Sequence, residues 1–343
     1  MLSTAVAKAP WYDVAIIDVF SRDAFLWAEA VAWVMRRLGK PYVLALHGGG
    51  LPSFLASQPW RARRLLQPAA AVVAPSTFLK HGLQQYRDDI LLIPNAIDIA
   101  GYHFRTRGPL SPRLVWLRAF HSMYAPEQAV EVLARVKRRF PTATLLMIGG
   151  DKGDGSLQRT TRLVQQLGLT TAVSFAGTIQ KADVPNWLNN GDIFLNTTTV
   201  DNMPVSVIEA MACGLCVVST NPAGIPHLLD HGSTALLAPV GDVPALVEAV
   251  ERLLADTDLA RQLSFAGRSL VEAFDWKHVL PRWERVLRSA TQPGFARARL
   301  SGESPASPTP VSILETATGE MQEPNRPFPA CVCTERNGAD PQI

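Results

Sequence analysis

The stretch Thr199-Val-Asp-Asn-Met-Pro-Val-Ser-Val-Ile-Glu-Ala-Met-Ala-Cys-Gly214 lies between two short apolar runs, each of which suits a buried strand. A proline in the first turn of a helix sacrifices no hydrogen bond, so Pro204 indicates where a helix begins. Asp201 then lies in the loop before that helix, and Glu209 lies inside it. A helix N-terminus favours negative charge and offers free backbone N–H groups. The stretch therefore predicts a strand–loop–helix–strand unit with two carboxylates beside a phosphate-binding end.

Short apolar runs alternate with helical patterns along most of the chain. The expected strands are Val14–Ile17, Val43–Leu46, Ala71–Ala74, Ile90–Ile93, Leu114–Leu117, Leu145–Ile148, Val173–Ala176, Ile193–Leu195, Cys216–Ser219 and Ala235–Leu237. Such alternation predicts parallel sheets covered by helices. The strands fall into two sets, separated by the Gly-, Pro- and Arg-rich segment Gly101–Pro112. We expect an α/β fold with two Rossmann-like domains, 1–110 and 111–290, whose facing edges form a cleft that holds the site.

Composition limits the classes of protein to consider. The chain has 343 residues, of which 47% are hydrophobic and 18% charged, as in folded globular proteins. Its net charge of +3 is compatible with an acidic ligand or an anionic membrane and demands neither. No apolar run reaches the ~18–20 residues of a membrane span, and no signal peptide is recognisable. We expect a cytoplasmic protein, with peripheral contact at the inner membrane surface left open, and a disordered tail over 291–343.

Two short motifs have spacings that metal sites also use. Cys213-Gly-Leu-Cys216 has no second cysteine pair in the folded body, so we interpret both cysteines as packing residues. Asp256-Thr-Asp258 has the spacing of a metal-binding DxD loop, but it falls between two helical patterns, where a capping role is favoured. We assign no metal site.

The opening stretch closely resembles the donor-site motif of the family 4 retaining glycosyltransferases, which have the GT-B fold. In that family two acidic residues separated by seven precede Ala-Met-Ala-x-Gly and an apolar strand. Asp201 and Glu209 hold the acidic positions, with Asp201 where the family usually has Glu. The resemblance implies that Asp201 lies against the transferred sugar and that Glu209 holds the ribose of the donor. Main-chain groups of the loop Met203, Pro204 and Val205 would then meet sugar and phosphate.

The resemblance extends over most of residues 11–290. Asn95 stands in a segment similar to the one that ends the family's first domain, and Arg118 stands where the family places an arginine on the donor diphosphate. His47 precedes three glycines that permit close backbone approach, and it resembles a histidine that reaches the sugar across the cleft. Structural roles stay open as well: a packing histidine at His47 and a surface ion pair at Arg118.

Two features depart from the family pattern. A lysine that normally follows the arginine is absent between Arg118 and Pro126, so His121 or Lys152 would have to supply the second cation for the diphosphate. The Asn95 segment also arrives after fewer than one hundred residues. The resemblance therefore implies an N-terminally shortened chain, whose incomplete first domain would lack its opening strands and expose a sheet edge.

The resemblance implies a metal-independent, retaining glycosyltransferase of hexosyltransferase type. It would move a sugar from a nucleotide-sugar donor, such as a UDP- or GDP-sugar, to a glycan, lipid-linked or other glycoconjugate acceptor. We expect no further cofactor and no nucleic-acid partner. The alternative from another class is a catalytically impaired remnant that binds the donor. A sugar-nucleotide epimerase is a weaker rival, and a nicotinamide dehydrogenase is weaker still, because no GxGxxG opens a helix after an expected strand.

Overall fold

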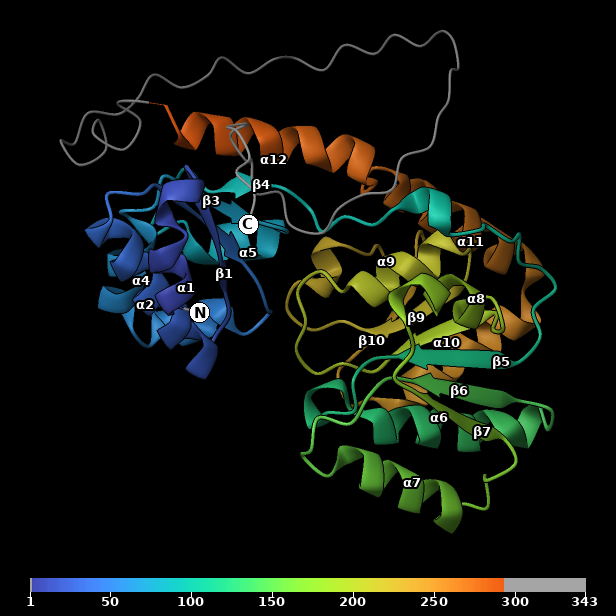
Figure 1. Ribbon diagram of the computed structural model, residues 1–343. Helices are drawn as coiled ribbons and strands as arrows, with labels where there is room; N and C mark the ends of the chain where they lie inside the picture. Colours follow the sequence, from blue (N-terminus) through green and yellow to red (C-terminus); the bar gives the residue numbers. More distant parts are fainter. Residues whose placement is uncertain (1, 293–343) are drawn as a thin grey trace, which may run out of the picture.

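Two parallel sheets organise the chain, of which the computed structural model describes residues 2–292 (Figure 1). The predicted tail, 291–343, lies outside the described residues apart from its first two positions. The first sheet has the order β1-β2-β3-β4 and the second has the order β10-β9-β8-β5-β6-β7. Their strands are β1 (Ala15–Val19), β2 (Tyr42–Leu46), β3 (Ala71–Ala74), β4 (Leu91–Leu92), β5 (Arg113–Leu117), β6 (Thr144–Ile148), β7 (Val173–Gly177), β8 (Ile193–Asn196), β9 (Cys216–Thr220) and β10 (Leu236–Ala238). The predicted α/β architecture with two parallel sheets is confirmed.

One face of the first sheet carries all the helices that connect its strands. Each strand is followed by its next neighbour in the same direction, so right-handed crossovers place every connection on one side. These helices are α2 (Asp23–Arg37), α3 (Leu51–Ala56), α4 (Pro59–Leu66) and α5 (Thr77–Leu83), and the short α1 (Leu2–Ala7) packs on α2. The hydroxyl of Ser76 caps α5 by accepting from the backbone N–H of Leu79 at 3.2 Å. The six-residue helices α1 and α3 were not predicted, because so short a segment shows no helical period.

The opposite face of this sheet is covered by the last helix, α12 (Trp276–Ala290), which lies along the first lobe in Figure 1. Its apolar stripe of Val279, Val286 and Ala290 packs against Val43 and Val73. The predicted second domain runs to residue 290, whereas its last helix, α12, packs on the first sheet and covers a face that the connecting helices leave bare. We call residues 2–100 with α12 the first lobe, and residues 102–272 the second lobe.

The second sheet reverses direction in its middle. After β5, β6 and β7 the chain crosses back to place β8 on the other side of β5, and it continues outward through β9 and β10. Helices α6 (Pro126–Arg139), α7 (Ser156–Gln166) and α10 (Val243–Ala255) pack on one face, while α8 (Val184–Leu188) and α9 (Val205–Ala212) pack on the other. In open parallel sheets, ligands bind at the carboxyl ends of the strands that flank such a switch point. Here those strands are β5 and β8.

Both motifs with metal-like spacing have structural roles. Asp256 caps α11 (Thr257–Glu272), with its carboxylate accepting from the N–H of Leu259 at 2.9 Å, as the position between two helices suggests. Cys213 and Cys216 are buried free thiols, and burial raises the pKa of each to about 12. A thiol held in this way stays protonated and acts as a small apolar side chain.

The outer edge of the first sheet exposes apolar surface. Within residues 2–292, β1 has a single strand neighbour, β2, and the side chain of Ile16 in β1 is 51% exposed. Phe20, just beyond the strand, is exposed as well. None of the helices in the described range is both long and apolar enough to cross a membrane.

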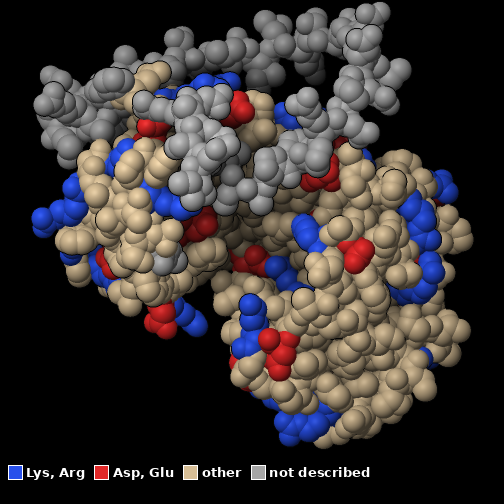
Figure 2. Space-filling model, in the orientation of Figure 1, with Lys and Arg blue, Asp and Glu red and all other residues tan. Residues whose placement is uncertain are grey.

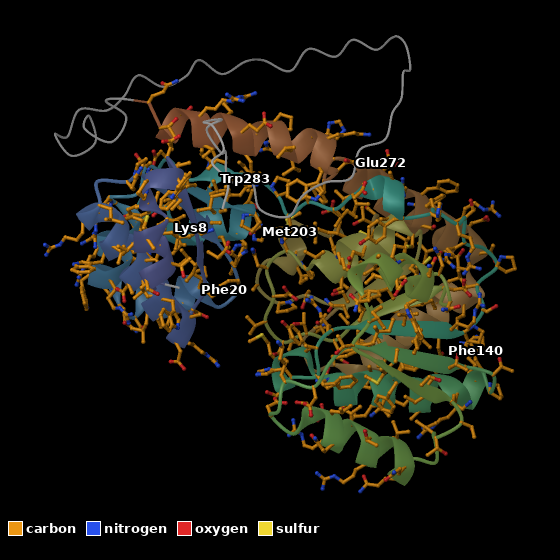
Figure 3. The ribbon with its side chains drawn as sticks, viewed as in Figure 1. Lys8, Phe20, Phe140, Met203, Glu272 and Trp283 are labelled. Carbon is orange, nitrogen blue, oxygen red and sulfur yellow. The ribbon has the colours of Figure 1, made fainter. Side chains whose placement is uncertain are left out.

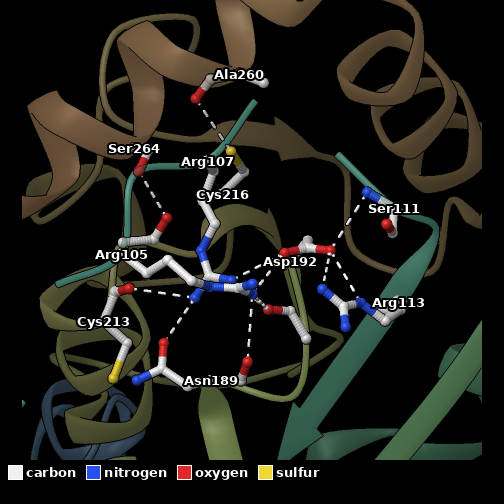
Figure 4. Close-up of polar contacts among 12 residues, drawn as sticks. Arg105, Arg107, Ser111, Arg113, Asn189, Asp192, Cys213, Cys216, Ala260 and Ser264 are labelled. Carbon is white, nitrogen blue, oxygen red and sulfur yellow. Dashed lines mark hydrogen bonds and ion pairs between the residues drawn. The ribbon is translucent and has the colours of Figure 1, made fainter. Parts of the chain in front are cut away.

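The linker between the two sheets is fastened to the second lobe by a buried arginine (Figure 4). Arg107 is 1% exposed, and its Nη1 donates to Asp192 Oδ1 at 2.9 Å and to the carbonyl of Gly191 at 2.7 Å. Its Nη2 donates to the side chain of Asn189 and to the carbonyl of Cys213. A segment predicted to be a plain connector is therefore held in place by hydrogen bonds.

Arg107→Ala should destabilise the second lobe, because it leaves the carboxylate of Asp192 buried with less compensation. Loss of one partner of a buried ion pair costs ~3–5 kcal/mol. Arg105→Ala is the matched control: Arg105 also contacts Asp192 but is half-exposed, and such a pair contributes ~1 kcal/mol or less. Urea unfolding followed by circular dichroism measures both variants. Equal losses in the two variants would contradict the role given to Arg107.

Candidate active site

An ion pair joins the two strands at the switch point. Arg118 directly follows β5, and Asp201 lies in the loop after β8; Nη2 of Arg118 contacts Oδ2 of Asp201. Both side chains are largely buried, and the guanidinium lies 4.8 Å from the centre of the Tyr124 ring. Figure 2 shows basic and acidic atoms side by side in the recess between the lobes. The structure thus brings together two residues that the sequence analysis assigned to the sugar and the diphosphate of the donor.

Arg118 has a buried donor without a partner among the described residues. Its Nε is buried, yet no hydrogen-bond acceptor among residues 2–292 reaches it. Ser206, in the first turn of α9, likewise has a buried hydroxyl with no partner in the described part of the chain. Buried polar groups are nearly always hydrogen-bonded in native proteins, so these two donors are available to a ligand or a water molecule.

Glu209 lies on α9 and is 3% exposed. Its Oε1 accepts from the hydroxyl of Tyr102 at 2.6 Å and also contacts Nζ of the exposed Lys181. Burial raises the pKa of the Tyr102 hydroxyl, and the hydrogen bond to Glu209 raises it further, so Tyr102 acts as a donor. The sequence analysis identified Glu209 but missed Tyr102 and Lys181, which come from the linker and from the turn after β7.

The loop between Asp201 and Glu209 is hydrogen-bonded to the first lobe. Nδ2 of Asn95, in the first lobe, donates to the carbonyl of Met203 at 2.7 Å. The side chain of Met203 packs into the core of the second lobe, so only the main chain of this residue faces the junction. Figure 3 shows Met203 where the two lobes meet. Pro204 is the N-cap of α9 and Val205 its first residue, as Pro204 predicted.

His47 lies at the carboxyl end of β2, across the cleft from this loop. Its Nε2 is 2.9 Å from Oδ1 of Asp18 on the neighbouring strand, and its ring stacks on Phe20 at 4.8 Å. The hydrogen bond from His47 lowers the pKa of the Asp18 carboxyl. Asp18 and Phe20 were not predicted as partners, because spacing within a sequence does not show which residues of adjacent strands face each other.

Gly49, two residues after His47, explains why this loop is rich in glycine. A Cβ on Gly49 would lie 2.3 Å from the carbonyl oxygen of Asp201, inside the contact limit. The first-lobe loop therefore approaches the second-lobe acid as closely as backbone allows. His47, Asn95 and Val205 line one pocket of about 280 Å³, whose other walls include Trp276 and Trp283 of α12.

Lys152 and His121 are the two residues expected to supply a second cation for the diphosphate. Lys152 is exposed in the loop after β6, and its backbone N–H donates to the carbonyl of Phe120 at 3.1 Å. That loop touches the segment of Arg118, since a Cβ on Gly149 would overlap the carbonyl oxygen of Arg118. His121 instead uses Nδ1 to accept from the N–H of Met123, and its Nε2 is 4.0 Å from Asp154. Lys152 thus remains available, whereas His121 is engaged locally.

Further polar contacts hold the lobes together beside the site. The hydroxyl of Ser76, which caps α5, also contacts Oδ1 of Asn202 in the loop that carries Asp201. Thr77 Oγ1 lies 3.1 Å from Nδ1 of His227 in the second lobe. The N-terminus of α5 is therefore seated on the acidic loop, a contact that sequence spacing did not reveal.

Comparison with known sequences matches a family profile to each part of the chain. The family profile described as Glycosyltransferase Family 4 matches residues 5–100, and the profile described as Glycosyl transferases group 1 matches residues 111–256. The chain belongs to glycosyltransferase family 4. The predicted resemblance is thereby confirmed, over segments that include His47, Asn95, Arg118, Asp201 and Glu209.

Relatives of this family 4 glycosyltransferase are distant. It is 26% identical over 216 residues to the N-acetyl-alpha-D-glucosaminyl L-malate synthase of Bacillus anthracis, which covers 60% of this chain and 55% of that protein. It is 26% identical over 291 residues to the alpha-maltose-1-phosphate synthase of Mycolicibacterium smegmatis, covering 74% of each. The chain thus spans only about half the length of the first relative.

Solved structures show the same fold. HepE of Anabaena, in complex with UDP and glucose, superposes with a TM-score of 0.71 at 20% identity, covering 84% of this chain and 81% of that one. Sucrose-phosphate synthase of Thermosynechococcus elongatus gives 0.70 at 21% identity, with coverages of 83% and 75%. The GT-B arrangement expected from the sequence is confirmed.

Tyr102→Phe should destabilise the chain, because it removes a buried hydrogen bond to the Glu209 carboxylate; such bonds are worth ~1.5–3 kcal/mol. Lys181→Met removes the other contact to the same oxygen, but Lys181 is exposed, so the expected loss is ~1 kcal/mol or less. Chemical denaturation ranks the two variants. If Lys181→Met were the more damaging change, Tyr102 would not be what fixes Glu209.

Proposed function

We propose that this family 4 glycosyltransferase binds a nucleotide-sugar donor in its second lobe and transfers the sugar to an acceptor with retention of configuration and without a metal ion. The donor would be a UDP- or GDP-sugar. The acceptor would be a glycan, a lipid-linked sugar or another glycoconjugate, met on the first-lobe side of the cleft. Family membership and the switch-point site support this proposal.

The observation that carries the proposal is the unsatisfied Nε of Arg118 beside Asp201. A guanidinium presents parallel donors that suit phosphate oxygens. With Nη2 on Asp201, the remaining donors of Arg118 would serve the diphosphate, as would the hydroxyl of Ser206 and the backbone N–H groups at the start of α9. A diphosphate thus satisfies both orphaned donors.

Glu209 supports the nucleoside end of the same ligand. Tyr102 fixes its Oε1, while no donor among the described residues reaches its Oε2. One ribose hydroxyl would donate a hydrogen bond to Oε2 of Glu209, and a second hydroxyl would replace the exposed Lys181 at Oε1. The buried carboxylate therefore selects a ligand that brings hydroxyl donors.

The chemistry would depend on charge rather than on a covalent intermediate. As the bond between the anomeric carbon and the diphosphate breaks, positive charge grows on the sugar ring and negative charge on the leaving oxygen. Asp201 would stabilise the positive charge on the ring, and Arg118 with the N-terminus of α9 would stabilise the negative charge on the leaving oxygen. The acceptor oxygen would attack from the face that the diphosphate leaves, and it would lose its proton to that leaving group.

The alternative is a donor-binding protein with impaired transfer. It is favoured by the contacts of His47 with Asp18 and Phe20 within the first lobe. Donor binding is common to both proposals, so a transfer assay with a bound donor separates them.

Glu209→Ala should weaken binding of nucleotide sugars by ~1–3 kcal/mol, because a charged acceptor for ribose is lost. Calorimetric titration with a UDP- and GDP-sugar panel measures the loss. Glu251→Ala, an acid on α10 that pairs with Arg139 at the surface, serves as the matched control and should bind as the unmodified chain does. Equal affinity for Glu209→Ala and this control would remove Glu209 from the donor site.

Asp201→Asn should lower turnover more than donor affinity. The substitution keeps the shape of the side chain but removes the charge that counters the developing cation. Steady-state rates and donor affinities are compared with those of Asp258→Asn, whose side chain is fully exposed on α11. A variant that loses affinity and rate in equal proportion would indicate that Asp201 only positions Arg118.

A further inference from the structure

The first lobe exposes tryptophan to an unusual degree. Four of the eight tryptophans lie within the first sixty residues, and their exposed fractions range from 48% to 71%. Nine of the fifteen large hydrophobic side chains that are exposed between residues 2 and 292 belong to the same segment. Single exposed apolar residues need no explanation, but clustered large ones mark an interaction surface.

Two of these tryptophans face each other across neighbouring helices. Trp33 of α2 and Trp60 of α4 line a shallow groove of about 360 Å³, together with Glu29, Ala30 and Arg64. We call this surface, with Leu26 and Arg37 on the outward side of α2, the α2–α4 face. It is firmly built, since Arg61 donates to Oε1 of Glu29 at 3.1 Å and lies over the rings of Phe25 and Phe54.

The charge of the α2–α4 face is positive. Four exposed arginines surround the tryptophans: Arg36, Arg37, Arg63 and Arg64. Arg37 stacks on the Trp33 ring at 5.1 Å, and Arg36 donates to the backbone carbonyl of Arg64 at 3.3 Å. Glu29 is already paired with Arg61, so its charge does not offset these four cations. Figure 2 shows basic atoms along this outer side of the first lobe.

We propose that the α2–α4 face binds the surface of an anionic phospholipid membrane. Indole rings prefer the boundary between headgroups and acyl chains, where one edge is apolar and the N–H meets water. Guanidinium groups pair with lipid phosphates, and arginines near an anionic surface are attracted by its potential. Large aromatic rings lie on one helical layer with arginines that form no ion pair within residues 2–292, and this combination is the complement of such a surface.

The fold allows this contact while the cleft stays open. The connecting helices cover one face of the first sheet and α12 covers the other, whereas the cleft lies at the carboxyl ends of the strands. In Figure 1, α2 and α4 lie on the side of the first lobe that is turned away from the second lobe. The inference does not depend on the proposed transfer reaction, because binding to vesicles requires no donor.

Flotation of the full chain with vesicles tests the proposal directly. The chain should float with vesicles that contain phosphatidylglycerol and stay behind with pure phosphatidylcholine. Binding should weaken with added salt, which screens the attraction between exposed charges. Lipids with a quencher attached near the headgroup should reduce tryptophan fluorescence of the bound protein, since the indoles would enter the interface.

Substitutions on the α2–α4 face test whether this surface binds the vesicles. Replacing Trp33 and Trp60 by Ser should abolish most of the binding. Arg37→Ala with Arg64→Ala should reduce partitioning roughly five-fold for each arginine, as ~1 kcal/mol per residue implies. Leu167→Ser and Arg138→Ala provide matched controls, because both side chains are exposed on the second lobe. Circular dichroism and thermal melts establish that each variant is folded.

Three results would overturn the proposal. Equal flotation with neutral and anionic vesicles would remove the role of the arginines. Unchanged flotation of the Trp33 and Trp60 double variant would move the binding elsewhere. An absence of flotation, together with concentration-dependent dimerisation that the same double variant abolishes, would assign the α2–α4 face to a second copy of this chain.

Discussion

The pairing of β5 with β8 is the constraint on which the site depends. Leu114 and Val115 of β5 stand beside Ile193 and Phe194 of β8, although almost eighty residues separate them in the sequence. Parallel strands end at the same edge of a sheet, so this pairing delivers Arg118 and Asp201 to one point. Their opposite charges then neutralise each other in a largely buried place. Burying either charge alone would cost free energy. The ion pair avoids this cost and still leaves Nε of Arg118 free to donate to an anion.

The first lobe is held against this point from two sides. Backbone at Gly49 touches Asp201, Asn95 bonds to the carbonyl of Met203, and Ser76 contacts Asn202. On the far side, α12 crosses from the second lobe to cover the first sheet. The linker follows the second lobe, since Arg107 fixes it there. If one lobe moves against the other, the backbone must therefore bend close to the two points where the chain crosses between the lobes. Ile97 and Asp275 pair there as an isolated β-bridge.

The strands could be predicted from the sequence, because an apolar run of four or five residues between helical patterns rarely forms another kind of structure. It also predicted that Asp201 lies in a loop and Glu209 inside the helix that follows, because the spacing of both residues around Pro204 is a local feature. It did not reveal Tyr102, Lys181 or the pairing of His47 with Asp18, which depend on the register of distant segments. The destination of α12 was missed for the same reason: its amphipathic stripe shows that it packs, but not against which sheet. The sequence analysis assigned only main-chain groups of Met203 to the ligand, and it did not show that the side chain of this residue packs into the core.

The most direct measurement of the central claim is an experimental structure of this chain with UDP or GDP bound. The account predicts the diphosphate between the Nε of Arg118 and the N-terminus of α9, within hydrogen-bond distance of the hydroxyl of Ser206, and the ribose on Glu209 with Lys181 displaced. A nucleotide found instead in the pocket between His47 and Trp283, with Arg118 and Glu209 unchanged, would contradict it.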